Sequence, residues 1–138
     1  MRVRDVMTRD VEMTHPEATL QDAALRMRQS NVGFLPVGQG DRLVGVLTDR
    51  DIVLRAVSLG RDPTATRVKD AMTPQVLYCF EDQLVEEAAD AMELRVVRRL
   101  VVLDRDKRLV GIVSLDDLAT VPTVEARVGE VLERMADL

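Results

Sequence analysis

The chain has 138 residues, of which 46% are hydrophobic and 31% charged, a balance typical of a folded globular protein. Its net charge of −5 and its 2% of aromatic residues argue against a nucleic-acid-binding surface, which needs a basic footprint and usually stacking side chains. No apolar run reaches the roughly 18 residues of a membrane span, and no apolar stretch follows the charged N-terminus. We therefore expect a cytoplasmic protein that contacts neither nucleic acid nor membrane.

The first elements in chain order are a short strand and a helix. The alternating segment at 11–13 predicts the strand. Thr19, followed three residues later by Asp22, predicts a capping box that opens the helix. The apolar residues that follow share one helical face: Leu20, Ala23, Ala24 and Met27.

A hairpin and a second helix follow. The segment 35–37 predicts a strand, and Pro36 favours its edge or first position. After a turn rich in glycine, 43–47 predicts the second strand of the hairpin. Thr48 then opens a helix that we expect to end near Gly60. The whole unit is β-α-β-β-α.

The second half of the chain repeats the first. Val-Arg-Asp-Val-Met-Thr at 3–8 recurs 65 positions later as Val-Lys-Asp-Ala-Met-Thr at 68–73. After one added residue in the hairpin turn, 43–52 matches 109–118. The repeat predicts strands near 76–78, 99–103 and 108–113, and helices near 82–94 and 115–120.

The repeat divides the chain into a first repeat at 1–60, a linker at 61–67, a second repeat at 68–121 and a C-terminal helix at 122–138. About fifty residues make a marginal core, so we expect the two sheets to pack on each other with pseudo-twofold symmetry. The last helix carries an apolar stripe that either closes back on the core or packs against a second subunit. Its members are Val128, Val131, Leu132 and Met135.

The repeated motifs resemble those of CBS domains, named after cystathionine β-synthase. They are the Met-Thr pair that begins each repeat, Leu-Pro-Val at 35–37, Gly-Val-Leu-Thr-Asp-Arg-Asp at 45–51 and Gly-Ile-Val-Ser-Leu-Asp-Asp-Leu at 111–118. The second repeat departs from the pattern in having Val101 where the first has Pro36. The resemblance implies a stand-alone CBS-domain pair (Bateman module) of the mixed α/β (α+β) class, with the two sheets packed face to face.

The resemblance also implies a regulatory module that is not an enzyme. Such pairs usually bind an adenosine-containing ligand (AMP, ADP, ATP, NAD or S-adenosylmethionine) between the repeats, signal to a partner protein and associate as homodimers. The alternative is a ligand-free dimerisation or interaction protein that retains the fold. In a third interpretation, a nucleotide-hydrolysing enzyme would hold Mg²⁺ with Asp49, Asp51, Asp116 and Asp117, but the sequence has neither a Gly-rich phosphate loop nor a positioned base. No obligatory cofactor and no metal site are expected.

In the family, the Ser/Thr and Asp of a Gly-x-x-Ser/Thr-x-x-Asp motif contact the ligand. These positions are Thr48 and Asp51 in the first repeat, and Ser114 and Asp117 in the second. A carboxylate can accept two hydrogen bonds from a ribose diol, and a hydroxyl at a helix N-terminus lies where phosphate is attracted. The same spacing is that of a capping box, so either copy alone could be purely structural.

Family geometry pairs each motif with the other repeat, which predicts two unequal clefts. One cleft would offer an apolar wall, a ribose acceptor and guanidinium groups for phosphate: Thr48, Arg50, Asp51, Leu77, Tyr78, Arg98 and Arg99. The other would be more acidic and less suited to a polyphosphate: Gly33, Phe34, Ser114, Asp116 and Asp117. We expect the stronger site to be the one that includes Asp51.

A single cysteine and a single histidine exclude an intrachain disulfide, most metal sites and most pairs of nucleophile and base. Cys79 is expected to be a small buried apolar residue, and His15 to lie at the surface. The seven methionines are expected to fill the core in place of aromatic side chains.

Overall fold

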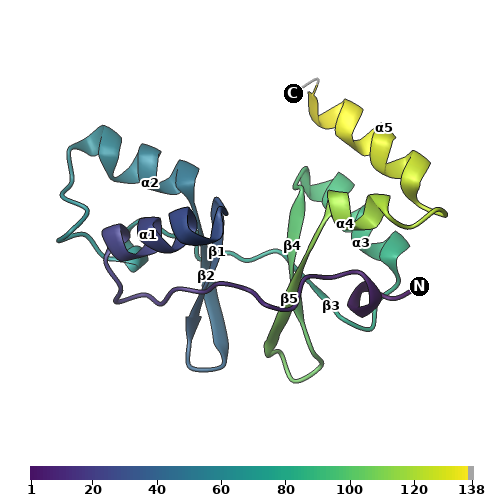
Figure 1. The fold of residues 1–138 in the computed structure, drawn as a ribbon, viewed down its shortest axis with the longest axis horizontal. Helices are drawn as coiled ribbons and strands as arrows, with labels where there is room; N and C mark the ends of the chain where they lie inside the picture. The colour runs from purple at the N-terminus through teal and green to yellow at the C-terminus, as the bar shows by residue number, and fades with distance from the viewer. Residues whose placement is uncertain (137–138) are drawn as a thin grey trace. The chain divides into compact units, whose positions relative to one another are not determined.

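The computed structural model describes residues 1–136, which form two compact units (Figure 1). The first, here called the split unit, combines Met1–Asp10 with the described residues from Leu77 onward. The second, the continuous unit, is Val11–Val76. Among the described residues, no helix is both long enough and apolar enough to cross a membrane.

The continuous unit is built on one hairpin. Strands β1 (Phe34–Gln39) and β2 (Arg42–Thr48) pair antiparallel, with Pro36 opposite Val46. Helix α1 (Leu20–Ser30) precedes the hairpin, and α2 (Asp49–Arg55) follows it. Two short 3-10 helices, η2 (Val57–Leu59) and η3 (Val68–Asp70), complete the unit.

The prediction of a strand at 11–13 is wrong. In its place the structure has a single parallel bridge, in which Thr14 donates to the Pro36 carbonyl and accepts from the Gly38 amide, both at 3.0 Å. Pairing stops there because the chain turns at once, with the Ala18 amide donating to the His15 carbonyl at 3.1 Å. His15 is exposed, as predicted.

Helix α1 begins where its sequence predicts. The Asp22 amide donates to Thr19 Oγ1 at 3.1 Å, and Leu20, Ala23 and Met27 are buried. The return bond of a capping box is replaced by one from Arg26 Nε to the Asp22 carboxylate at 3.2 Å. Ala24, predicted on the buried face, is exposed.

The split unit repeats this plan with one more strand. Strand β3 (Tyr78–Phe80) runs parallel to β4 (Arg99–Leu103), which pairs antiparallel with β5 (Leu109–Ser114). Its helices are η1 (Val3–Asp5), α3 (Val85–Arg95), α4 (Leu115–Ala119) and α5 (Glu125–Ala136). The mixed α/β class and the repeated order of elements are confirmed.

Helix α5 closes back on its own unit, the first of the two alternatives for the C-terminal stripe. Val128 and Val131 are buried in the same hydrophobic cluster as α3 and α4. Arg127 forms ion pairs with Asp90 and Glu93 of α3, and Arg134 forms another with Glu93.

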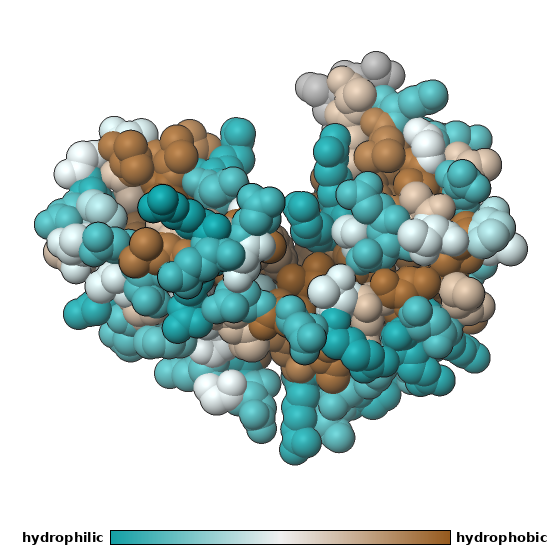
Figure 2. Space-filling view, viewed as in Figure 1, coloured by the Kyte–Doolittle hydropathy of each residue, from teal (hydrophilic) through white to brown (hydrophobic). Residues whose placement is uncertain are grey.

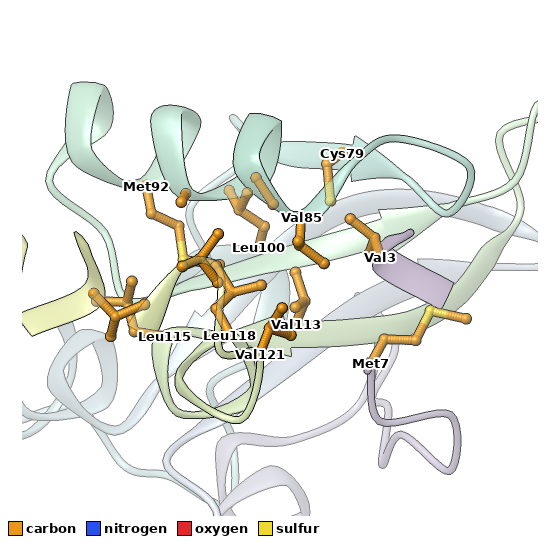
Figure 3. Packing of buried hydrophobic residues seen from close by; sticks show 14 of the residues in the cluster. Val3, Met7, Cys79, Val85, Met92, Leu100, Val113, Leu115, Leu118 and Val121 are labelled. Carbon is orange, nitrogen blue, oxygen red and sulfur yellow. The ribbon is translucent and has the colours of Figure 1, made fainter. Parts of the chain in front are cut away.

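The compact units do not coincide with the sequence repeats, because the first segment of each repeat packs in the unit of the other. Val3 and Met7 of the first repeat lie in the core of the split unit, beside Val85 and Val113 of the second (Figure 3). Thr8 and Ile112 exchange two backbone hydrogen bonds, of 2.8 and 2.9 Å.

The same exchange occurs in the continuous unit. Thr73 of the second repeat and Val46 of β2 exchange backbone hydrogen bonds of 2.8 and 2.9 Å. Both contacts require a glycine: a Cβ at Gly45 would lie 2.9 Å from the Thr73 carbonyl oxygen, and one at Gly111 would lie 2.6 Å from that of Thr8. The Met-Thr pair that begins each repeat therefore crosses to the other unit and lies against a glycine of its hairpin.

Cys79 lies in the split-unit core, as predicted (Figure 3). Burial raises the pKa of its thiol to about 12. The side chain therefore stays a neutral, apolar thiol at ordinary pH.

Candidate functional site

Helices α2 and α4 begin in the same way, directly after the last strand of a hairpin. The Asp51 amide donates to Thr48 Oγ1 at 3.1 Å, and the Thr48 amide donates to Asp51 Oδ2 at 3.0 Å. In α4 the corresponding distances between Ser114 and Asp117 are 3.1 and 2.9 Å. Both motifs thus form complete capping boxes.

Capping uses one oxygen of each carboxylate. Among residues 1–136, Oδ1 of Asp51 and Oδ1 of Asp117 have no hydrogen-bond partner. Both aspartates are half-buried rather than enclosed. The capping role and a ligand-binding role are therefore compatible, because the capping bond fixes the carboxylate while leaving one oxygen able to accept.

In the split unit, the arginine pair adjoins the Ser114–Asp117 motif. The register of the β4–β5 hairpin places Arg99 opposite Ser114. The Arg98 carbonyl accepts from the amide of Leu115, the first residue of α4, at 3.0 Å. Both arginines are exposed, and within the described chain their guanidinium groups have no ion-pair partner. Two free cations therefore lie at the end of the sheet where α4 begins.

An apolar and an aromatic side chain begin the neighbouring strand. Tyr78 pairs with Val101 in the parallel β3–β4 register, and the Leu77 carbonyl accepts from the Val101 amide at 3.4 Å. Leu77 is 37% exposed and Tyr78 42%. The start of β3, the start of β4 and the end of β5 thus bring one set of predicted residues to one end of the sheet: Leu77, Tyr78, Arg98, Arg99, Ser114, Asp116 and Asp117.

The continuous unit gathers the remaining predicted residues at the corresponding end of its hairpin. Phe34 pairs with Thr48, and the Gly33 carbonyl accepts from the Asp49 amide at 3.0 Å. Arg50, in the first turn of α2, is exposed. This end has a phenyl ring and a glycine where the split unit has two arginines, so the two ends differ in charge. The predicted difference was between clefts shared across the repeats, with Arg98 and Arg99 beside Asp51, and it stays a prediction.

Sequence reasoning missed one contact at this end. A Cβ on Gly33 would lie 2.6 Å from Asp49 Oδ2, so the Asp49 carboxylate lies directly over the glycine. The second repeat has buried Leu115 in place of Asp49. A small residue before the hairpin and an acidic first helical residue were the available signals.

The pairing of Thr48 and Asp51 with Arg98 and Arg99 across the repeats stays a prediction. The register adds a different relation, since it places Arg98 and Arg99 beside the motif of their own repeat. In the part of the chain that the structure describes, no three His, Cys, Asp or Glu residues are grouped to hold a metal ion.

Known proteins share this architecture. The family model for the CBS domain matches residues 3–58 and again 68–123. The CBS domain-containing protein YhcV of Bacillus subtilis (strain 168) is 42% identical over 117 residues, which are 85% of this chain and 82% of that protein. The crystal structure of Hypoxic Response Protein I with two coordinated zinc ions has a TM-score of 0.78 at 36% identity, covering 88% of this chain and 98% of that one. The crystal structure of CBSX2 in complex with AMP has a TM-score of 0.75 at 28% identity, covering 91% and 98%. The chain therefore belongs to the CBS domain family and carries two copies of the domain.

Proposed function

We propose that this chain is a regulatory module, without enzymatic activity, that binds an adenosine-containing ligand (AMP, ADP, ATP, NAD or S-adenosylmethionine) and signals its presence to a partner protein. The observation that carries the proposal is the free Oδ1 of Asp51 and of Asp117 at two equivalent capped helix starts. The similarity to CBSX2, crystallised with AMP, supports the choice of ligand.

The capped aspartate is suited to a ribose. Oδ1 accepts from a ribose hydroxyl, while the bond from the Ser114 or Thr48 amide to Oδ2 holds the carboxylate in position before the ligand arrives. The Ser114 hydroxyl oxygen accepts from the Asp117 amide, so its hydrogen remains free to donate to the ligand. No covalent step is required of any of these groups.

We assign phosphate binding to Arg98 and Arg99. Guanidinium groups form bidentate, charge-assisted hydrogen bonds with phosphate, and these two are exposed and unpaired within residues 1–136. Leu77 and Tyr78, at the start of the neighbouring strand, supply an apolar surface for adenine.

Two aspartates are candidates for the ribose acceptor that accompanies this phosphate site. The pairing across the repeats that the family resemblance implies favours Asp51. The hairpin register, which brings Arg99 opposite Ser114, supports Asp117. We favour Asp117 because its assignment uses only contacts within one unit. The Asp51 end, with Gly33, Phe34 and Arg50, then binds a ligand with less phosphate.

Substitution of each aspartate by asparagine tests the proposal. Asparagine keeps a carbonyl oxygen for the capping bond but turns an amide donor toward the ribose. Loss of a hydrogen bond to a charged group costs about 1.5–3 kcal/mol, which weakens binding at least about tenfold. Asp22→Asn, at the third position of α1, is the matched control and should bind like the parent.

The measurement is calorimetric titration with AMP, ATP, NAD and S-adenosylmethionine. Asp117→Asn is expected to lose AMP affinity, and a loss confined to Asp51→Asn would transfer the phosphate site to the cross-repeat arrangement. If none of the four ligands binds at millimolar concentration, the ligand-binding proposal is wrong and the interaction-protein alternative gains support. A switch further requires that the ligand bind one conformational state more tightly than the other.

Self-association is favoured by one observation. Four large apolar side chains of α2 and η2 are 50–64% exposed: Val53, Leu54, Val57 and Leu59. Figure 2 shows hydrophobic residues gathered over α2. We propose that this face pairs with the same face of a second copy, as in an isologous homodimer. Sedimentation equilibrium tests it: Val57→Asp should yield monomers, and Leu94→Asp, at a 78% exposed residue of α3, should not change the association state.

A further inference from the structure

A groove in the continuous unit lies between the end of α1 and the start of α2. It is an open hollow of about 310 Å³. Its lining is partly apolar and partly charged: Met27, Arg28, Asn31, Val32, Gly33 and Asp49. We call it the α1–α2 groove.

The corresponding face of the split unit is covered. The repeat aligns Met27 with Met92 of α3, and Asp49 with Leu115 of α4. Met27 and Met92 are both buried, at 7% and 0% exposure, but Asp49 is exposed whereas Leu115 is 2% exposed in a cluster that also contains residues of α5. Helix α5 packs on both α3 and α4, whereas the described part of the continuous unit has no α-helix that corresponds to α5 (Figure 1). The α1–α2 groove is therefore the uncovered counterpart of a surface that binds an amphipathic helix.

Charge shows which helix fits this groove. In the split unit, Asp90 and Glu93 of α3 hold α5 by ion pairs with its two arginines. The aligned residues of α1 are Leu25, which is 46% exposed, and Arg28, which is exposed. Helix α1 thus has apolar Leu25 where α3 has Asp90. It has cationic Arg28 where α3 has Glu93. A helix that carried arginines like those of α5 would be repelled by Arg28.

We propose that the α1–α2 groove binds an amphipathic helix of a partner protein, in the place that α5 takes in the split unit, with a carboxylate of that helix paired to Arg28. An apolar residue of the partner helix contacts Leu25. The chain's own α5 is not the occupant, because Val128 and Val131 are already buried in the split unit. The proposal goes beyond nucleotide binding and does not depend on it.

Two synthetic peptides based on the α5 sequence (125–136) test, on the full chain, whether the groove prefers a helix with a carboxylate over one with arginines. One peptide is native, and the other carries Arg127→Leu and Arg134→Glu to match Leu25 and Arg28. Both are stapled on the exposed face, because isolated helices of about 12 residues are marginal in water. By fluorescence anisotropy, we expect the substituted peptide to bind at least about tenfold more tightly than the native one, since repulsion is replaced by attraction.

Chain variants decide whether the peptide occupies the groove. Arg28→Glu should reverse the preference between the peptides. Leu25→Asp should weaken the substituted peptide and strengthen the native one, because Arg127 pairs with the aligned Asp90 in the split unit. Arg42→Glu, at an exposed arginine of β2 in the same unit, should leave the preference as in the parent.

Three outcomes would overturn the proposal: neither peptide binds, Arg28→Glu leaves the order unchanged, or Arg28→Glu alters the association state of the chain in sedimentation. The last outcome would make a second copy the occupant. AMP binding is measured on the same samples. Absence of AMP binding would contradict the nucleotide proposal and leave the result for the groove unaffected.

Discussion

The backbone contact at Gly111 predicts a large effect from a single methyl group. In Gly111→Ala the new Cβ would lie 2.6 Å from the Thr8 carbonyl oxygen and 2.9 Å from Met7 Sδ. Methionine can adapt, but a backbone oxygen at this distance cannot stay in place. The segment that begins the chain must therefore move away from β5.

The size of the effect follows from what this segment contributes. Thr8 and Ile112 exchange two backbone hydrogen bonds, each worth about 1 kcal/mol net. Val3 and Met7 are buried, and each side chain contributes about 1.5–3 kcal/mol by leaving water. Because the alanine displaces the segment without removing it, we expect a loss of about 2–3 kcal/mol, in the usual range for overpacking.

Gly129→Ala is the matched control, with the opposite expected sign. Gly129 lies within α5, and a Cβ there would meet nothing within 4 Å. Alanine in a helix interior is more stable than glycine by about 0.5–1 kcal/mol. Urea unfolding should therefore show Gly111→Ala below the parent in stability and Gly129→Ala above it.

Hydrogen exchange identifies the cause of the loss. In Gly111→Ala the amides of Thr8 and Ile112 should exchange faster than in the parent, because their mutual bonds are the ones disturbed. A Gly111→Ala protein as stable as the parent, with both amides still protected, would refute the exchanged arrangement of the first segment.

Three other predictions concern the ligand, a helix end and the thiol. Arg98→Gln combined with Arg99→Gln should weaken AMP at least about tenfold in calorimetry while leaving adenosine unchanged, because only the phosphate contact is lost. Equal losses for both ligands would contradict the assignment. Val96 ends α3 in the left-handed conformation with φ 56°, where the aligned Asn31 of α1 has φ 52°. Val96→Gly should therefore stabilise the protein by about 1 kcal/mol in urea unfolding, and a loss would show that no strain is stored there. The pKa of Cys79, raised by burial to about 12, predicts that thiol reagents label the native chain only as it unfolds. Since the unfolded thiol ionises near pH 8.5 and the native one does not, the free energy of unfolding should fall as pH rises from about 9 toward 12. Rapid labelling of the folded chain at pH 8 would contradict this.

Local signals in the sequence were enough for most elements. Thr19 caps α1, and both capping boxes formed where Ser/Thr-x-x-Asp predicted them. The stripe on α5 correctly indicated a covered face. These features depend on residues a few positions apart, which a single sequence displays directly.

Features that depend on distant partners were missed. The alternation at 11–13 is that of a strand, but a strand needs a neighbour, and only Thr14 meets β1 before the chain turns. Nothing local shows which unit receives the segment ending at Thr8 or Thr73. The aligned glycines, Gly45 and Gly111, were the only trace of that close approach.

The candidate site likewise has features that the sequence predicted and one that it missed. The residues that cap α2 and α4 were identified from their spacing. The predicted difference in charge was between clefts shared across the repeats, and it stays a prediction. The relation of Arg99 to Ser114 was available in principle, because a hairpin brings the first residue of one strand opposite the last residue of the next. The family resemblance implies a pairing with the other repeat, which stays a prediction.

Amide chemical shifts during an AMP titration test the nucleotide proposal most directly. In the ¹⁵N-labelled full chain, the amides of Ser114 and Asp117, together with those of Arg98 and Arg99, should shift progressively and saturate. Asp117→Asn should move the midpoint to at least about tenfold higher AMP concentration. Amides at both capped helix starts that remain unmoved at millimolar AMP would contradict the proposal.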